Sequence, residues 1–219
     1  MRRMGPIDLT RTAVFFDYDG TLSVRDTGVA VLEALGDLAW RDVDAEYERG
    51  EIGSRVCLLD EWDLLPKDPD ALRAAARAVP LDPDAEPLLA DLRAAGAEVA
   101  IVSDGFGFYV HERLGHTGVP IFTNAVDWST GALEFPNADR CCACSSCGTC
   151  KQAPIKDAKR RGLTTVMVGD GVSDQKAALL ADVLFATAGL AAWCDRAGVA
   201  YRRFSTMADV RAVLLPDRG

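Results

Sequence analysis

Short apolar runs that stop at small or acidic residues recur along the chain. Four of them lie at residues 12–16, 98–102, 164–168 and 183–186. The first leads into Asp17, the second into Ser103 and the third into Gly169 and Asp170. A continuous apolar run of this length, bounded by turn residues, is typical of a strand that is buried on both faces. The pattern therefore predicts buried strands that are followed by polar loops.

Stretches with helical periodicity separate these runs. They cover residues 87–95, 107–114, 173–181 and 205–214. Strands that alternate with helices predict an α/β fold built on a parallel sheet. Because ligands bind outside the carboxyl ends of the strands in such sheets, the acids and the serine that follow the runs are the strongest functional signal in the sequence.

The stretch from residue 23 to residue 83 contains no convincing strand. Its helical runs, at 27–35, 42–49, 54–64 and 69–79, are separated by glycine and proline. About sixty residues exceed what an ordinary crossover between parallel strands needs, although crossover structure is the alternative reading. We therefore expect a helical cap at 23–83, inserted after the first strand of a core formed by 1–22 and 84–219.

The composition is that of a folded, acidic protein. Of the 219 residues, 49% are hydrophobic and 26% charged, which is enough apolar material for a sizeable core. The 33 acidic and 24 basic residues give a net charge of −9, which argues against nucleic acids and anionic membranes as partners. The N-terminal sequence shows no apolar run that is typical of a signal peptide or membrane span, so we expect a cytoplasmic protein. The sequence leaves the oligomeric state open.

Acidic residues cluster after two of the predicted strands. Asp17 and Asp19 follow the first run, and Asp170 and Asp174 follow the third. Taken alone, an acidic pair in a loop is usually a solvated turn. The repetition at a second strand end favours a shared site instead, because a divalent cation offsets the repulsion and carboxylate oxygens suit Mg²⁺.

These residue types also support phosphoryl chemistry. A carboxylate such as Asp17 can attack a phosphoryl group and form an acyl phosphate, while Asp19 protonates the leaving oxygen and later activates water. Ser103 and the amides around Asp104 and Gly105 would hold phosphate oxygens. A cation should complete the site, and both lysines that precede the Asp170 strand, Lys151 and Lys156, are candidates.

Four segments together resemble the motifs of the haloacid dehalogenase superfamily. They are DYDGT from Asp17, IVSDG around Ser103, Lys151, and VGDGVSDQKAA around Asp170. The resemblance implies a Rossmann-like core and a phosphorylated Asp17, with Asp19 as acid and base. It also implies that Mg²⁺ is bound by Asp17, the Asp19 carbonyl and Asp170 with support from Asp174, and that Ser103 and Lys151 hold the phosphate.

Within that superfamily, the acid at Asp19 favours phosphate transfer over dehalogenation, because a halide leaving group needs no proton. The helical insertion is similar to that of the phosphoserine phosphatase branch. Asp26 and Arg55 lie roughly where such enzymes carry cap residues that face the substrate, and Phe106 follows the Ser103 loop. We expect these three, with Asp104 and Gly105, to bind the substrate. Arg55 would bind a substrate carboxylate, the alternative being an exposed helix arginine.

The segment CSSCGTCK, residues 144–151, resembles the methionine-salvage phosphatases that act on 2-hydroxy-3-keto-5-methylthiopentenyl-1-phosphate. It is more distantly similar to phosphocholine and pyridoxal phosphatases. Asp104 departs from the phosphoserine phosphatases, which usually have glycine after the serine. The expected partner is a small phosphorylated metabolite, and phosphoserine, phosphocholine, pyridoxal phosphate and the methionine-salvage enol phosphate all remain candidates.

Cysteines recur at every third position of this segment, as Cys141, Cys144, Cys147 and Cys150. Four thiolates suit Zn²⁺, and an iron–sulfur cluster, a disulfide or unmodified thiols are alternatives. Because Cys150 directly precedes Lys151, we hypothesise that ordering of the cysteines positions that lysine.

The leading hypothesis is thus a Mg²⁺-dependent phosphatase for a small molecule. A catalytically silent cysteine-metal or redox module on the same fold is the competing class. A phosphotransferase or mutase is a third, in which an alcohol instead of water accepts the phosphoryl group.

Overall fold

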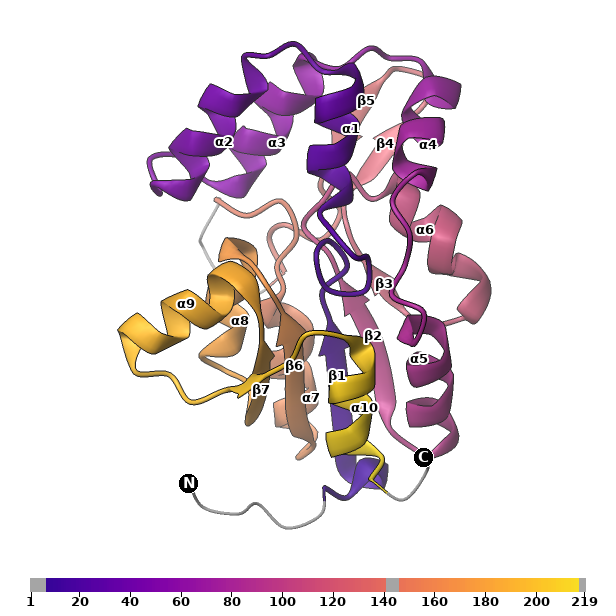
Figure 1. Ribbon diagram of the computed structural model, residues 1–219, viewed down its shortest axis with the longest axis vertical. Coiled ribbons are helices and arrows are strands. Elements are labelled where there is room, and N and C mark those ends of the chain that lie inside the picture. Colours follow the sequence, from indigo (N-terminus) through magenta and orange to yellow (C-terminus); the bar gives the residue numbers. More distant parts are fainter. Residues whose placement is uncertain (1–6, 141–145, 217–219) are drawn as a thin grey trace.

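A central parallel sheet organises the molecule (Figure 1). The computed structural model describes residues 7–140 and 146–216. Its six strands run in the order β3-β2-β1-β6-β7-β8, and every neighbouring pair is parallel. The strands are β1 (Thr12–Phe16), β2 (Glu98–Val102), β3 (Ile121–Phe122), β6 (Thr164–Gly169), β7 (Val183–Ala186) and β8 (Arg202–Arg203). The predicted α/β class with a Rossmann-like sheet is confirmed.

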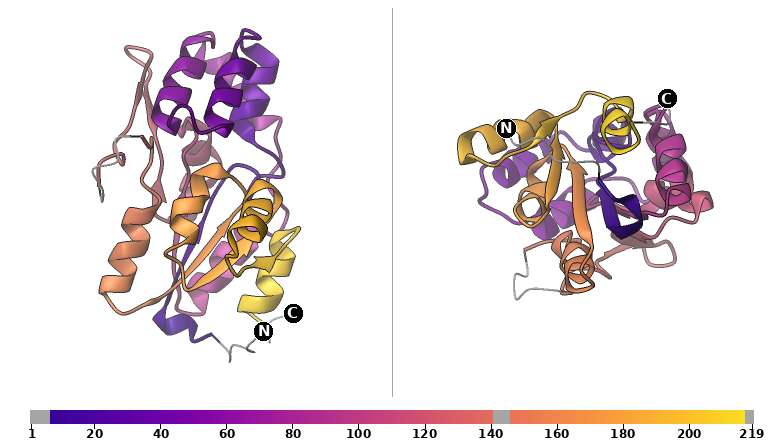
Figure 2. Two further views of the ribbon diagram at one scale, coloured as in Figure 1. Left: turned by 90° about the vertical axis from the view of Figure 1, so that its left-hand side faces the viewer. Right: turned by 90° about the horizontal axis from the view of Figure 1, so that it is seen from below.

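Helices cover both faces of this sheet (Figure 2). Val14 and Phe16 of β1 join the larger apolar core, which includes side chains of α5 (Ala85–Ala94), α6 (Phe108–Leu114) and α10 (Met207–Leu214). Ala13 and Phe15 point to the opposite face and join a second core with α7 (Gln152–Arg160), α8 (Gln175–Ala178) and α9 (Ala188–Ala197). Successive side chains of a strand point to opposite faces of the sheet. Because both faces are covered, all five residues of β1 are buried. The run therefore reads as continuously apolar.

Five helices separate β1 from β2, and the first four lie beyond the carboxyl ends of the strands (Figure 1). They are α1 (Thr27–Leu35), α2 (Trp40–Glu48), α3 (Ser54–Asp63) and α4 (Pro69–Arg77). Asp26 caps α1 by accepting a hydrogen bond from the Val29 amide, and Asp68 caps α4. An antiparallel hairpin of β4 (Ala125–Asp127) and β5 (Ala132–Glu134) lies beside them. The Trp62 indole on α3 donates to the Gly131 carbonyl in that hairpin at 2.8 Å.

The structure differs from the expected elements mainly where they are short. The hairpin and the two-residue edge strands β3 and β8 carry too few residues for an alternating pattern. The helix expected at 173–181 is a 3-10 turn (Val172–Asp174) followed by α8 alone. Among the described residues, none of the helices combines the length and the apolar character that a membrane crossing requires.

Candidate active site

Three carboxylates meet where β1 and β6 end. The two strands are neighbours, with Phe16 paired to Val168, so Asp17 and Asp170 follow them at the same edge of the sheet. One oxygen from each of Asp17, Asp170 and Asp174 lies within 4.8 Å of the others. Asp17 is 5% exposed and Asp174 is fully buried. The structure thus brings together three of the acids that the sequence singled out.

Lys151 supplies the positive charge in this group. Its Nζ lies 2.7 Å from Asp17 Oδ1 and 2.7 Å from Asp174 Oδ1, and it donates to Ser173 Oγ at 2.8 Å. Burial lowers the pKa of Lys151, but Asp17 and Asp174 outweigh burial and raise it. Conversely, burial and Asp174 raise the pKa of Asp17 well above its ordinary value, despite Lys151. We call Asp17, Lys151, Asp170 and Asp174 the floor of the site.

The floor has more negative than positive charge. One ammonium faces three carboxylates, and burial together with Asp174 raises the pKa of Asp170 to about 7. Asp170 Oδ1 accepts one hydrogen bond, from Thr21 Oγ1 at 3.1 Å. Buried oxygen ligands in this arrangement fit a divalent cation such as Mg²⁺, which would remove the excess charge.

Gly20 lets the chain turn beside the floor. Its φ is +67°, which glycine adopts without strain. A Cβ at this position would lie 2.4 Å from Asp170 Oδ2. Any other residue would therefore displace Asp170, which explains the glycine of the DYDGT segment.

The Asp19 carboxylate lies apart from the three floor carboxylates. Its Oδ1 accepts a hydrogen bond from the Thr27 amide, and its Oδ2 accepts one from the Tyr109 hydroxyl, both at 2.9 Å. Burial and the neighbouring Asp26 raise the pKa of Asp19 to about 8. Tyr109 was absent from the sequence expectations, because a tyrosine on the buried side of a helix carries no separate signal.

Several hydrogen bonds hold the loop after β2. Ser103 is fully buried, and its Oγ accepts a hydrogen bond from the Gly105 amide at 3.2 Å. Asp104 accepts from Ser54 Oγ and from the Thr149 amide, both at 2.5 Å. Asp104 therefore ties the start of α3 and the segment before Lys151 to the core.

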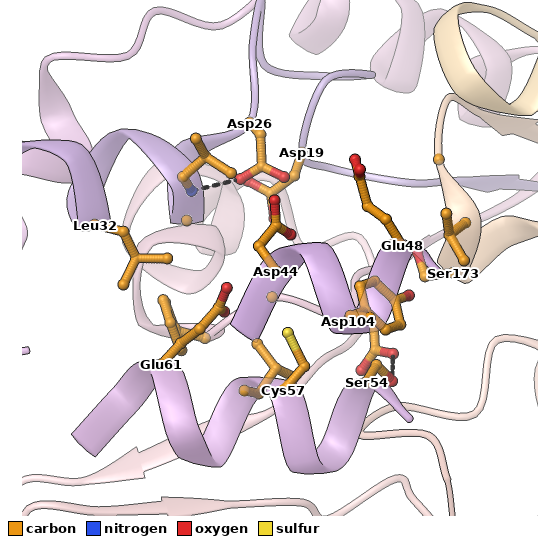
Figure 3. A pocket seen from close by; sticks show the side chains of 18 of the residues that line it. Asp19, Asp26, Leu32, Asp44, Glu48, Ser54, Cys57, Glu61, Asp104 and Ser173 are labelled. Atoms are coloured by element: carbon orange, nitrogen blue, oxygen red, sulfur yellow. Dashed lines mark hydrogen bonds between the residues drawn. The ribbon is translucent and has the colours of Figure 1, made fainter. Parts of the chain in front are cut away.

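A cavity of about 330 Å³ lies between the sheet edge and the helices α1–α3. Asp104, Gly105 and Phe106 line it, as expected of substrate-binding residues. Eight carboxylates line it in all: Asp17, Asp19, Asp26, Asp44, Glu48, Glu61, Asp104 and Asp170. Among the described residues, no lysine, arginine or histidine is part of the lining. We call the four acids on the side of the helices, Asp26, Asp44, Glu48 and Glu61, the roof of the site (Figure 3).

Arg55 does not reach this cavity. The α3 residues that line it are Ser54, Cys57, Leu58 and Glu61, which share one helix face by their spacing. Arg55 lies off that face, and its Nη2 pairs with Asp139 at 3.1 Å while its Nε donates to the Cys147 carbonyl at 3.2 Å. The guanidinium is thus paired outside the cavity, and a contact between Arg55 and a substrate carboxylate stays a prediction.

Of the four cysteines proposed for a second site, Cys141 and Cys144 lie outside the described residues. Cys150 is buried, and its amide donates to the Asn137 carbonyl at 3.0 Å. Cys147 Sγ lies 3.5 Å from Lys176 Nζ. Within the described parts of the chain, the floor carboxylates are the single group with metal-binding geometry, so nothing supports zinc at the cysteines.

The fold and the site define a class of protein. Residues 12–182 match the family model of the haloacid dehalogenase-like hydrolases, so the chain belongs to this family. The expected superfamily is therefore confirmed, and so is the expectation of an enzyme of the phosphoric monoester hydrolase class.

Two named relatives are similar to this chain over at least 90% of its length. A protein of Exiguobacterium sp. strain AT1b, named 2-hydroxy-3-keto-5-methylthiopentenyl-1-phosphate phosphatase, is 27% identical over 209 residues, covering 93% of this chain and 97% of the relative. A protein of the same name from Exiguobacterium sibiricum is 28% identical over 207 residues, covering 90% and 93%.

Solved structures show the same fold. A substrate-bound phosphoserine phosphatase complex has a TM-score of 0.68 at 20% identity, over 90% of this chain and 95% of that one. A phospho-aspartyl intermediate analogue of phosphoserine phosphatase also has a TM-score of 0.68 at 20% identity, over 94% and 98%.

Proposed function

We propose that the chain is a Mg²⁺-dependent phosphatase that hydrolyses the phosphate monoester of a small metabolite through a phosphorylated Asp17. The observation that carries this proposal is the contact between Asp17 and Lys151 at 2.7 Å, beside Asp170 and at the edge of the cavity. Lys151 holds one carboxylate oxygen of Asp17 and offsets part of the charge that an incoming phosphate adds.

In the first step, a carboxylate oxygen of Asp17 attacks phosphorus. The bond between phosphorus and the ester oxygen breaks, and the leaving oxygen takes a proton from Asp19. The Thr27 amide and the Tyr109 hydroxyl, which both donate to Asp19, support this role because they fix its orientation beside the cavity.

In the second step, Asp19 takes a proton from water, and the water oxygen attacks phosphorus. The bond to the Asp17 oxygen breaks, which restores the Asp17 carboxylate and releases inorganic phosphate. In this hydrolysis water accepts the phosphoryl group, whereas in the phosphotransferase and mutase alternatives an alcohol accepts it.

Mg²⁺ would be held by Asp17, Asp170 and the Asp19 carbonyl, with Asp174 in support. When bound, it supplies positive charge at the phosphoryl oxygens. Ser103 and Lys151 hold the phosphate: because Ser103 Oγ accepts from the Gly105 amide, its own hydroxyl hydrogen is left for a phosphate oxygen.

The substrate is a small molecule enclosed by the helices. We assign residues 23–83 as a cap over a core of 1–22 and 84–219, and the lining of the cavity by α1–α3 supports this division. The names of the relatives make 2-hydroxy-3-keto-5-methylthiopentenyl-1-phosphate one candidate substrate.

The Asp17→Asn variant tests the proposal. It should release phosphate from p-nitrophenyl phosphate with Mg²⁺ at least about 10³-fold more slowly, because an amide is a poor nucleophile. Asp60→Asn, which changes an exposed acid of α3, is the matched control and should keep the wild-type rate. A wild-type rate for Asp17→Asn would refute the assignment.

A further inference from the structure

None of the four roof acids forms an ion pair within the described parts of the chain; Asp26 and Glu48 are exposed, Asp44 is half-buried and Glu61 is buried. Asp26 lies at the start of α1, Asp44 and Glu48 lie on α2, and Glu61 lies on α3. All four line the cavity, and Figure 3 shows their carboxylates gathered around it. The phosphate and its metal belong to the floor, so the roof faces the remainder of the substrate.

Glu61 is the only buried acid of the roof. The residue is 6% exposed, and its carboxylate points into the cavity toward Asp44 (Figure 3). No ion pair links it to any described residue, and its hydrogen-bonding neighbour is the Cys57 thiol, a weak donor. Burial, then Asp44 and Asp26, raises the pKa of Glu61 to about 8. At neutral pH the buried carboxyl is therefore mostly protonated, and a cationic ligand beside it would favour the ionised form.

An inorganic ion does not fit these acids. Among the described residues, only the floor carboxylates bring three ligand oxygens within 4.8 Å of one another. The roof acids are more widely spread, along three helices. A dispersed set of carboxylates suits a larger organic cation, and the aromatic rings of Tyr47, Phe106 and Tyr109 in the same lining also favour one.

We propose that the preferred substrates carry a positively charged nitrogen, as an ammonium or quaternary ammonium group, on the alcohol that is released from the phosphate. The inference rests on the phosphatase function proposed above and names the substrate class of the same site. Phosphoserine fits poorly, because its carboxylate would meet the roof acids and Arg55 is directed outside. An uncharged alcohol would leave Glu61 without a partner.

A pair of substrates with the same shape and different charge tests the proposal. Phosphocholine carries a quaternary nitrogen, and 3,3-dimethylbutyl phosphate replaces that nitrogen with carbon. The kcat/KM of phosphocholine should exceed that of the neutral compound by about 10- to 100-fold, the effect of one charge-assisted contact. O-phosphoethanolamine, run in parallel, separates primary from quaternary ammonium groups. Equal values, or a preference for phosphoserine or the methionine-salvage enol phosphate, would overturn the proposal.

Variants locate the preference in the roof. Glu61→Gln and Asp44→Asn should each lower the ratio of kcat/KM for phosphocholine to kcat/KM for the neutral compound by about 10-fold. Asp60→Asn on the same helix should keep the wild-type ratio. Equal losses on both substrates would overturn the proposal. If wild-type protein hydrolyses none of the compounds, p-nitrophenyl phosphate included, the phosphatase function itself is overturned. The two failures are therefore distinguishable.

Discussion

At the floor of the cavity three carboxylates surround one buried ammonium, whereas at the roof four carboxylates face the cavity without a cation among the described residues. Lys151 is bonded to two of the floor acids, and the third, Asp170, sits where a divalent cation would bind. The roof acids lie on α2 and α3 or at the start of α1, and none of them forms an ion pair with another described residue. Under the function proposed above, metal and phosphate complete the floor, and the rest of the substrate completes the roof.

Removal of the Lys151 ammonium group should have the largest effect on the free energy of unfolding. Lys151→Met leaves Asp17 and Asp174 buried without their partner, and we expect the free energy of unfolding to fall by about 3–5 kcal/mol. Urea unfolding at neutral pH measures it. The exposed pair of Lys159 with Asp182 is the matched comparison, and Lys159→Met should cost less than about 1 kcal/mol. Equal losses in the two variants would contradict a buried charge centre.

A pH series examines the roof. The pKa of Glu61 is raised to about 8 in the folded chain, so between about pH 4.5 and pH 8 the folded state keeps a proton that the unfolded state has lost. The free energy of unfolding should therefore fall as pH rises through this window. Glu61→Gln cannot titrate and should remove about 2–4 kcal/mol of that fall.

The measurement is urea unfolding of wild type and Glu61→Gln at pH 5 and pH 8, without Mg²⁺ or substrate. Asp63→Asn, which changes an exposed acid at the end of α3, serves as the control and should follow wild type. Parallel pH dependences for wild type and Glu61→Gln would mean that Glu61 is not a strained, buried acid.

A smaller effect is expected where floor and roof are joined. Asp104 accepts from Ser54 at the start of α3 and from the Thr149 amide two residues before Lys151. Asp104→Asn weakens both charge-assisted bonds and should lower the free energy of unfolding by about 1–2 kcal/mol. Because the contact links α3 to the lysine segment, kcat/KM for p-nitrophenyl phosphate should fall as well. Ser54→Ala should reproduce part of the loss, and an unchanged rate in both variants would show that the link does not position the site.

The floor could be predicted from the sequence, whereas of the roof acids only Asp26 could. Apolar runs buried on both faces stand out in a sequence, and parallel strands bring the residues that follow them to one edge, which places Asp17 near Asp170. Asp44 and Glu48, in contrast, look like ordinary solvated acids of an amphipathic helix. Only the packing of α2 and α3 over the sheet edge turns them toward the cavity.

Arg55 shows that the sequence also does not tell which face of a helix meets the cavity. The sequence suggested a residue that binds substrate, but the cavity face of α3 is set by Ser54, Cys57, Leu58 and Glu61, and helical spacing leaves Arg55 off it. Which face of the helix meets the core depends on tertiary packing. The hairpin β4–β5 was missed for a different reason, since strands of three residues give no periodicity to detect.

Trapping of the phosphorylated enzyme tests the central claim most directly. In Asp19→Asn, p-nitrophenyl phosphate can still transfer its phosphoryl group, because nitrophenolate leaves without a proton, whereas the water step lacks its base. After incubation with Mg²⁺ and an acid quench, peptide mass spectrometry should find one phosphoryl group on Asp17, and none after Asp17→Asn is added to the same variant. An unmodified Asp17, or a phosphoryl group on another residue, would contradict the account.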